Sequence, residues 1–195
     1  MPTRAESAAS TRRDLLDAAA ELLDAGGPDA VTLREVGARA GVTRGAPYRH
    51  FPDKNSLMNA VAIEGWERVG DQVHAVRVDP GLSATEKLRA ALVALISVAR
   101  HQPHLYQLMC STPAGDPADA IRAAGRSQDE FRDVVATVVG DENANHYGAL
   151  LLAGAHGIAG MELTGYLAPD KWHTTADEVI ASLVRMVSAA GPATG

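Results

Sequence analysis

The chain has 195 residues, of which 46% are hydrophobic, and a formal net charge of -6. This length allows a substantial hydrophobic core and lies between one large domain and two small ones. Residues 1–55 contain eight basic and eight acidic residues, so the whole acidic excess lies in residues 56–195. The overall acidity therefore does not exclude a negatively charged partner for the first part of the chain.

Cysteine content and hydropathy indicate the cellular compartment. Cys110 is the only cysteine, which excludes an intramolecular disulfide and fits a reducing compartment. The N-terminus lacks an apolar signal core, and no stretch approaches the roughly 18 uninterrupted apolar residues of a membrane span. We therefore expect a cytoplasmic protein that does not enter the membrane.

The pattern of apolar residues predicts an all-α fold. Aromatic residues make up only 4% of the chain, and alternating β-branched runs are nearly absent. Apolar residues instead recur at helical spacing almost throughout.

The first helices are predicted from apolar spacing and from capping residues. We expect residues 1–9 to form a disordered arm and residues 11–25 to form a helix that ends at Gly26-Gly27-Pro28. Thr32 and Glu35 have the spacing of a capping box, which predicts a second helix to about residue 40.

A turn and a third helix follow directly. Gly41 supplies the left-handed residue that a tight turn between two helices needs. Thr43 is placed to cap the third helix, which is expected to end near His50.

The remaining helices are predicted from the same signals. A long helix is expected over residues 54–76, and a second capping box at Ser83 and Glu86 starts another that ends by His101. Residues 105–109 are typical of a short helix.

Three further helices complete the predicted fold. After a loop over residues 113–117, one helix should run to Gly140, another over residues 143–167, and a last one over residues 176–190. The last begins at a third capping box, formed by Thr175 and Glu178.

Positive charge is concentrated between Thr32 and Lys54. This segment holds five cations and two anions, a local charge of +3 in a chain whose net charge is -6. A negatively charged partner is the simplest explanation, and a plain three-helix bundle with solvated arginines is the alternative.

The same segment resembles the DNA-binding domain of TetR/AcrR-type transcriptional regulators. The resemblance covers roughly residues 10–58 and rests on Val-Thr-Leu-Arg-Glu-Val at 31–36 and Gly-Val-Thr-Arg-Gly-Ala-Pro-Tyr-Arg-His-Phe-Pro-Asp-Lys at 41–54. It implies a three-helix DNA-binding domain with a helix-turn-helix over residues 10–55, followed by a helical ligand-binding and dimerisation domain over residues 56–195.

The resemblance also implies the residues that bind DNA. They are Thr32, Arg34, Thr43, Arg44, Gly45, Ala46, Pro47, Tyr48, His50 and Lys54. A recognition helix enters the major groove by its N-terminal part, so residues 44–47 should face base edges, although Ala46 also fits the small core.

Two residues of this set are unusual. Pro47 stands where the family more often has another apolar residue, but its place near the first turn need not break the helix. Lys54 at a helix start opposes the helix dipole, and a phosphate between them would relieve that conflict.

Residues 56–195 resemble a C-terminal subtype named after a Trp-His-Gly motif, with Ala155 in place of the Trp. The resemblance implies a ligand chamber in this part, and the apolar residues there suggest an apolar pocket oriented by a few polar groups. The candidate lining residues are Leu92, Leu95, Leu105, Tyr106, Met109, Cys110, Phe131, Val135 and His156. The alternative is that they simply pack a helical core.

Glycines crowd one predicted helix, which suggests close packing against another helix. Gly154, Gly157 and Gly160 lie near one face of that helix. With Val179, Leu183 and Met186 of the last helix, they are the candidate dimer interface, and close packing within one subunit is the alternative.

No metal site, cofactor or catalytic set is predicted. His101 and His104 are separated by Pro103 and lack further ligands nearby, and Cys110 has no evident His partner.

The function expected is therefore that of a ligand-responsive repressor, not an enzyme. It would bind a palindromic double-stranded DNA operator as a homodimer and be released by a small molecule. A helical small-molecule carrier or enzyme with a vestigial DNA end is one alternative, and a dimeric adaptor that acts through protein contacts is another. A carrier would not need the set Thr43, Tyr48, His50 and Lys54.

Overall fold

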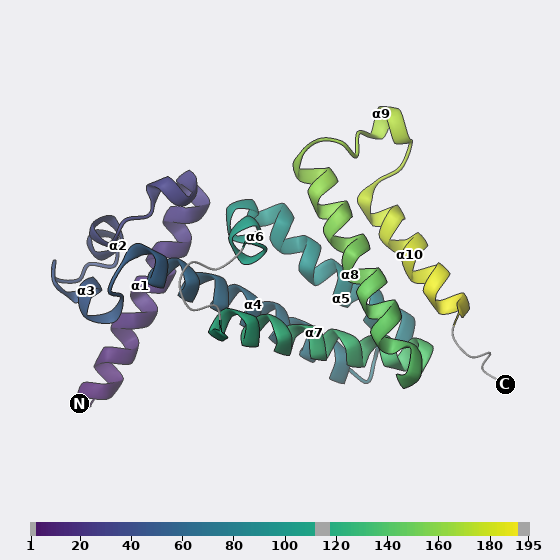
Figure 1. Cartoon of the computed structure of the whole chain (residues 1–195), viewed down its shortest axis with the longest axis horizontal. Helices are drawn as coiled ribbons and strands as arrows, with labels where there is room; N and C mark the ends of the chain where they lie inside the picture. The colour runs from purple at the N-terminus through teal and green to yellow at the C-terminus, as the bar shows by residue number, and fades with distance from the viewer. Residues whose placement is uncertain (1–2, 112–117, 191–195) are drawn as a thin grey trace. The chain divides into compact units, whose positions relative to one another are not determined.

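The computed structural model describes residues 3–111 and 118–190. This part of the chain contains ten helices and no strand (Figure 1), which confirms the predicted all-α fold. The predicted loop over residues 113–117 lies outside the described residues.

The chain divides into two compact units, with the division inside two helices. The first unit comprises residues 1–65 and 102–122, and the second comprises residues 66–101 and 123–195. The division therefore falls within α4 (Lys54–Val78) and within α7 (Ala118–Val139). The functional limits 10–55 and 56–195 remain a prediction.

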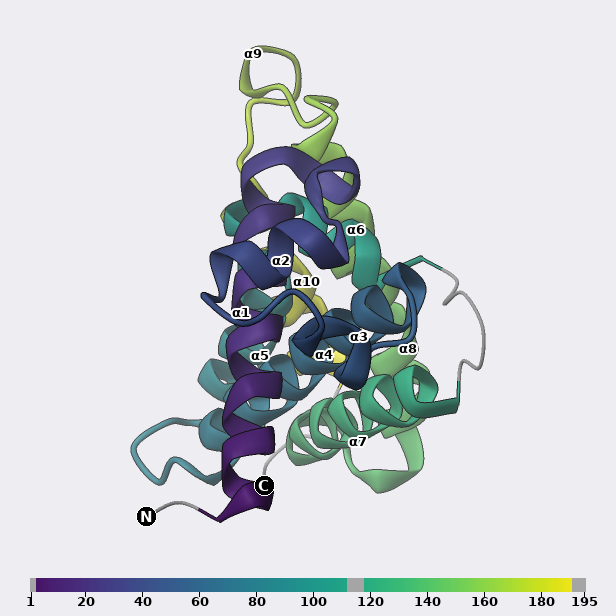
Figure 2. The ribbon, with the colours of Figure 1, turned by 90° about the vertical axis from the view of Figure 1, so that its left-hand side faces the viewer.

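The first unit is built on α1 (Arg4–Ala30). Figure 2 shows α2 (Leu33–Arg39) and α3 (Ala46–His50) packed beside it. The first part of α4, α6 (Pro103–Met109) and the first residues of α7, up to Arg122, complete this unit. Its core is formed by Leu15, Ala19 and Leu23 of α1 with Val36 and Phe51, all of them buried.

The predicted start of the first helix was wrong. Helix α1 begins at Arg4, seven residues before the expected start, so residues 3–9 are not a disordered arm. The reason is a capping box that the prediction overlooked. The Thr3 hydroxyl accepts from the Glu6 amide at 3.2 Å, and the Thr3 amide donates to the Glu6 carboxylate at 2.6 Å.

The predicted end of the first helix marks a real break in geometry. Gly27 has φ +68°, which interrupts the helical conformation just before Pro28. A Cβ at this glycine would lie 3.3 Å from the His104 ring of α6. The kink thus brings α6 against α1, and the Gln102 side chain adds a 2.8 Å hydrogen bond to Asp24.

The second unit contains the rest of α4, with α5 (Ala84–His101), the greater part of α7 (Ala118–Val139) and α8 (Asp141–Leu163). It also contains α9 (Pro169–Trp172), which was not predicted, and α10 (Ala176–Ala190). Helix α8 packs against both α5 and α10.

Two of the predicted capping boxes define helices of this unit. Ser83 and Glu86 exchange hydrogen bonds of 2.8 and 3.3 Å at the start of α5. Thr175 and Glu178 do the same at the start of α10, also at 2.8 and 3.3 Å. Both predicted helix starts are therefore confirmed.

Candidate DNA-binding surface and ligand cavity

The turn between α2 and α3 has the geometry that the sequence predicted. Gly41 has φ +67°. Its amide donates to the Ala38 carbonyl at 3.2 Å, and the Val42 amide donates to the Gly37 carbonyl at 3.1 Å. This pair of bonds is the Schellman motif, which ends a helix and turns the chain sharply. Gly41 therefore sets the angle at which α3 leaves α2.

Helix α3 begins later than expected. Its N-cap is Gly45, which offers no capping side chain, and the Thr43 carbonyl instead accepts from the Ala46 amide at 2.9 Å. The prediction that Thr43 caps this helix was wrong. The reason is that residues 43–46 form a turn, so Thr43 lies exposed before the helix.

Ala46 and Pro47 do not present their side chains outwards. Both are buried, so the expectation that they face base edges is corrected, and Ala46 takes its alternative place in the core. A Cβ at Gly37 would lie only 2.7 Å from the Pro47 Cγ. The proline ring thus occupies the space that the glycine of α2 leaves free, and this contact sets how closely α3 approaches α2.

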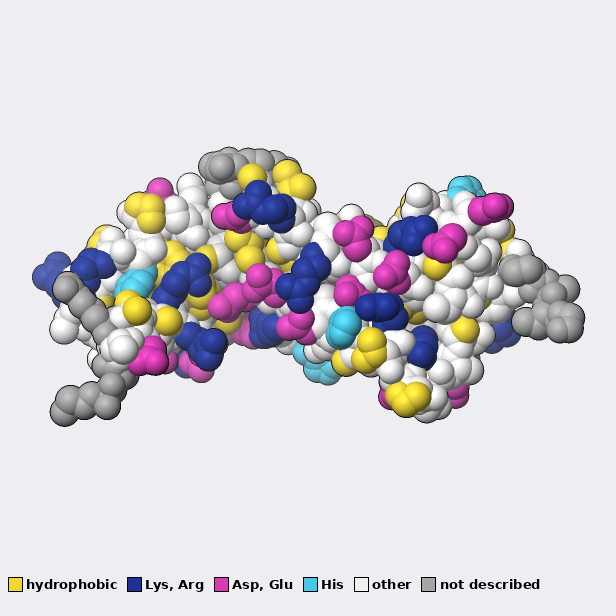
Figure 3. All heavy atoms as spheres, turned by 90° about the horizontal axis from the view of Figure 1, so that it is seen from below, with side chains coloured by type: hydrophobic (Ala, Val, Ile, Leu, Met, Phe, Trp, Pro, Cys, Tyr) yellow, Lys and Arg dark blue, Asp and Glu magenta, His cyan; other side chains and the backbone are white. Residues whose placement is uncertain are grey.

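The exposed side chains of this region are mostly basic or polar. Arg44 and Arg49 are exposed, Tyr48 is 56% exposed, and the Arg34 side chain is 81% exposed. Figure 3 shows Lys and Arg side chains spread over the end of the chain that carries these helices, at the left. Arg34, Arg44 and Tyr48 border one groove, whose floor includes Gly37 and Pro47.

The other members of the predicted set lie at the edges of α2 and α3. Thr32 is exposed and accepts from the Glu35 amide at 3.1 Å, as the N-cap of α2. Gly45 is exposed with no atom within 4 Å of an added Cβ, and His50 is half-buried. Arg39 pairs with Glu21 of α1 at 2.6 Å, which holds its charge beside α1.

Lys54 has a partner within the chain. Its Nζ donates to the Pro28 carbonyl in the last turn of α1 at 2.6 Å, where a cation is favoured by the helix dipole. Asp53 caps α4 instead, because its carboxylate accepts from the Ser56 amide at 2.7 Å. The unfavourable interaction expected between the Lys54 charge and the dipole of α4 is therefore relieved within the chain, without a phosphate.

Replacing Lys54 with methionine is expected to lower the free energy of unfolding by about 1 kcal/mol, because a charge-assisted hydrogen bond is lost from a half-buried site. Urea denaturation without DNA measures this loss. Arg49→Met, at an exposed position of α3, is the control and should change stability by less than about 0.5 kcal/mol. Equal stability of the Lys54 variant and the parent would show that the bond to α1 contributes nothing.

The second unit encloses a mainly apolar cavity between α4, α5, α7 and α8. It is lined by Trp66, Val69, Val73, Ala91, Leu92, Leu95, Ser127, Gln128, Phe131, Leu152 and His156. The free space in it is about 20 Å³, enough for about one water molecule. A larger ligand would have to displace wall side chains.

The cavity gathers four of the predicted pocket residues, namely Leu92, Leu95, Phe131 and His156. Val135 is fully buried but is not part of the wall. Burial lowers the pKa of His156 below its ordinary value, so its imidazole is neutral at neutral pH.

The other four predicted pocket residues are elsewhere. Leu105, Tyr106 and Met109 are buried in α6, and Cys110 is exposed at its end. Helix α6 belongs to the first unit, where Met109 fills the space beside Gly65 of α4, so Leu105, Tyr106 and Met109 are packed in a helical core. Burial also raises the pKa of Tyr106, with Cys110 as a smaller cause.

Sequence reasoning missed much of the cavity wall. Trp66, Val69 and Val73 follow one another on one face of α4, and this helical spacing could have indicated them. Ser127 and Gln128 carried no comparable signal, because a polar residue in a helix is more often solvated.

The candidate dimer residues fall into two groups. A Cβ at Gly154 would lie 2.9 Å from Leu183 Cδ1, so these two residues pack α8 against α10 within the chain. Gly157 and Gly160 have no atom within 4 Å of an added Cβ, and Met186 is 68% exposed. Val179 is half-buried. Gly157, Gly160 and Met186 therefore leave a surface of small and apolar residues that no other part of the described chain covers.

The described residues contain no group of three or more His, Cys, Asp or Glu side chains that could hold a metal ion. None of their helices combines the length and hydrophobicity that a membrane crossing needs.

The sequence matches two domain families. Residues 15–61 match the family described as bacterial regulatory proteins, tetR family. Residues 88–187 match the tetracyclin repressor-like C-terminal domain, so the resemblance to the Trp-His-Gly subtype stays a prediction.

Curated relatives share part of their length with this chain. It is 34% identical over 105 residues to the HTH-type transcriptional regulator SrpR of Pseudomonas putida, which covers 53% of this chain and 46% of SrpR. It is 33% identical over 113 residues to the HTH-type transcriptional repressor KstR of Rhodococcus jostii, which covers 58% of this chain and 51% of KstR. The chain thus spans about half the length of these relatives.

Solved structures share the fold over nearly the whole chain. A protein of unknown function from Rhodococcus sp. RHA1 has a TM-score of 0.77 and 26% identity, covering 92% of this chain and 94% of that one. A TetR-family transcriptional regulator from Streptomyces coelicolor has a TM-score of 0.65 and 22% identity, covering 94% and 96%. The solved structures show the shared fold, and the two domain matches, the second of which covers more than half of the chain, show that it belongs to the TetR family of bacterial regulatory proteins.

Proposed function

We propose that this protein is a ligand-responsive repressor that binds a palindromic DNA operator as a homodimer. It would act in the cytoplasm, where the operator DNA lies, and it would have no catalytic activity. The observation that carries this proposal is the groove of the first unit, bordered by the exposed Arg44 and Tyr48 next to a Schellman turn. Arg44 precedes α3 and can donate two hydrogen bonds to a guanine edge, while Tyr48 can donate to a phosphate.

The dimer is proposed to form through α8 and α10. Leu150 of α8 is 49% exposed, and Gly157 of the same helix has open space beside it. Met186 of α10 adds a 68% exposed apolar side chain. A second copy that covers this surface would compensate for the low helix propensity of the glycines. Two copies would also present two recognition helices to the two halves of an operator.

Replacing Gly157 with glutamate is expected to raise the dimer dissociation constant at least about tenfold, because a carboxylate would be buried against the second copy. Analytical ultracentrifugation measures this change. Gly125→Glu is the matched control, because Gly125 of α7 also has no atom within 4 Å of an added Cβ. A Gly157→Glu protein that dimerises like this control would exclude α8 as the interface.

The effector is proposed to enter the cavity of the second unit and to act through α4. Trp66 lines the cavity, and the preceding residue, Gly65, has no room for a Cβ, which would lie 2.6 Å from Met109 Sδ of α6. A ligand that displaces Trp66 would therefore strain the same turn of α4 that holds α6. Release of DNA follows if the ligand binds more tightly to the conformation that does not fit the operator.

Selection of genomic fragments on the immobilised protein tests the operator claim. A palindromic sequence should emerge that Arg44→Ala protein does not enrich. Equal enrichment by the variant would overturn the proposal.

A further inference from the structure

The wall of the cavity in the second unit carries no formal charge. Of its described residues, only Ser127, Gln128 and His156 are polar, apart from the indole N–H of Trp66. The rest are aliphatic or aromatic. Ser127 is only 5% exposed, whereas Gln128 beside it is exposed and forms the solvent-facing edge of the wall.

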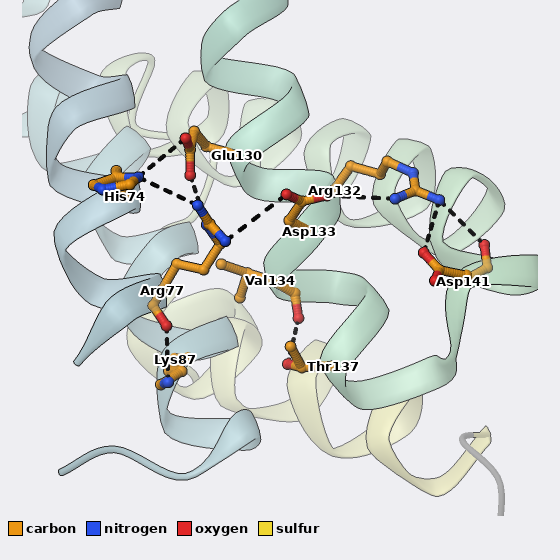
Figure 4. Close-up of polar contacts among 9 residues, drawn as sticks. All are labelled: His74, Arg77, Lys87, Glu130, Arg132, Asp133, Val134, Thr137 and Asp141. Carbon is orange, nitrogen blue, oxygen red and sulfur yellow. Dashed lines mark hydrogen bonds and ion pairs between the residues drawn. The ribbon is translucent and has the colours of Figure 1, made fainter. Parts of the chain in front are cut away.

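Three charged residues of α7 near the wall, Arg126, Glu130 and Arg132, are paired with residues outside it. Asp129, which follows Gln128, is exposed and does not line the cavity. Glu130 lies 2.7 Å from Arg77 and 3.1 Å from His74, both on α4 (Figure 4). Arg132 lies 3.0 Å from Asp141, at the start of α8. Glu130 and Arg132 therefore already have counterions.

The arginine on the other side of the wall residues is paired as well. Arg126, which precedes Ser127, lies 2.8 Å from Asp71 of α4. At the far end of α5, Arg100 pairs with Glu162 and Asp177 at 3.0 and 2.9 Å. None of these pairs lines the cavity.

His156 does not supply the missing charge. Burial lowers the pKa of its imidazole, so it carries no positive charge at neutral pH. An ionised group brought into such a wall would lose its hydration without gaining a counterion.

We propose that this cavity takes an uncharged ligand with an apolar body and one hydrogen-bonding group, and that it excludes carboxylates and ammonium compounds. The inference deepens the proposed function and rests on it for the role of the ligand as effector. Ser127, Gln128 and His156 bind the polar group, and Trp66 with Phe131 covers the apolar body.

The test uses Trp66 as a reporter in the full-length chain. Trp172 is the other tryptophan and is 51% exposed, so Trp172→Phe leaves Trp66 as the one source of indole fluorescence. The probes are 1-octanol, octanoate and octylammonium at pH 8, which share one alkyl chain and differ in charge. Octanol should change the emission saturably, and each ion should bind at least about 100-fold more weakly.

Two variants and one control locate the effect. Ala91→Leu fills the cavity and should abolish octanol binding, whereas Ala75→Leu, at an exposed position of α4, should not. Gln128→Lys places a cation in the wall and should strengthen octanoate binding at least about tenfold. Circular dichroism establishes that each variant is folded, and the Gln128 variant alone decides the question if Ala91→Leu does not fold.

Tight octanoate binding to the parent would overturn the proposal, as would the absence of any octanol response or equal octanol binding by a folded Ala91→Leu protein. Operator binding is measured separately on the parent. Octanol binding without any operator binding would contradict the proposed function and leave the ligand class standing. Operator binding together with a preference for octanoate would overturn the ligand class and leave the proposed function standing.

Discussion

Replacing Gly37 with alanine is expected to lower the free energy of unfolding by about 1–3 kcal/mol and to weaken operator binding at least about tenfold. The added Cβ would lie 2.7 Å from the Pro47 Cγ, which is too close for two carbon atoms. Because the proline ring is stiff, α3 must move away from α2. The overpacking exceeds the gain of about 1 kcal/mol that alanine brings to a helix.

The sign of this effect should reverse when the proline is removed. In a Pro47→Ala protein the space is free, so Gly37→Ala should stabilise by up to about 1 kcal/mol. Urea denaturation of the four proteins gives the coupling energy. Gly125→Ala is the control for helix propensity, because an added Cβ meets no atom within 4 Å. Additive effects at the two positions would refute the contact as the determinant of helix placement.

Replacing Arg44 with alanine is expected to cost about 1–3 kcal/mol of operator binding and to relax the preference at one base pair of each half-site. Arg44 is exposed at the groove beside Tyr48. Electrophoretic mobility shifts on operators changed at single base pairs measure both effects. The control is Arg68→Ala, an exposed arginine of α4 in the second unit. A loss that is uniform across all operator variants would show that Arg44 contacts phosphate and not a base.

Local signals in the sequence were enough to predict most helices. The boxes Ser83–Glu86 and Thr175–Glu178 define the starts of α5 and α10, because each box satisfies backbone groups next to it in the chain. The turn at Gly41 is equally local. The missed start of α1 carried the same signal in Thr3 and Glu6.

The contacts between helices could not be predicted in this way. The burial of Pro47 depends on Gly37 in another helix, and the bond of Lys54 depends on Pro28, 26 residues away. Helix α6 has an apolar face that suits a ligand chamber or a core equally well. Only its packing against α1 and α4 decides between them.

The ligand cavity shows the same limit. The prediction named Leu92, Leu95 and Phe131 as apolar wall residues and His156 as a polar group that orients a ligand. All four line the cavity. Which of their neighbours join them depends on how four helices pack around the space, and this register is not encoded in any single helix.

Binding of the parent protein and of Tyr48→Ala to the selected operator, as a function of salt, tests the central claim most directly. The affinity of the parent should fall at least about 100-fold between about 50 and 200 mM salt, because Lys and Arg contacts to phosphates release counterions. Tyr48→Ala should bind at least about tenfold more weakly at each salt concentration. Salt-independent binding, or a Tyr48→Ala protein that binds like the parent, would contradict the assignment of this surface to DNA.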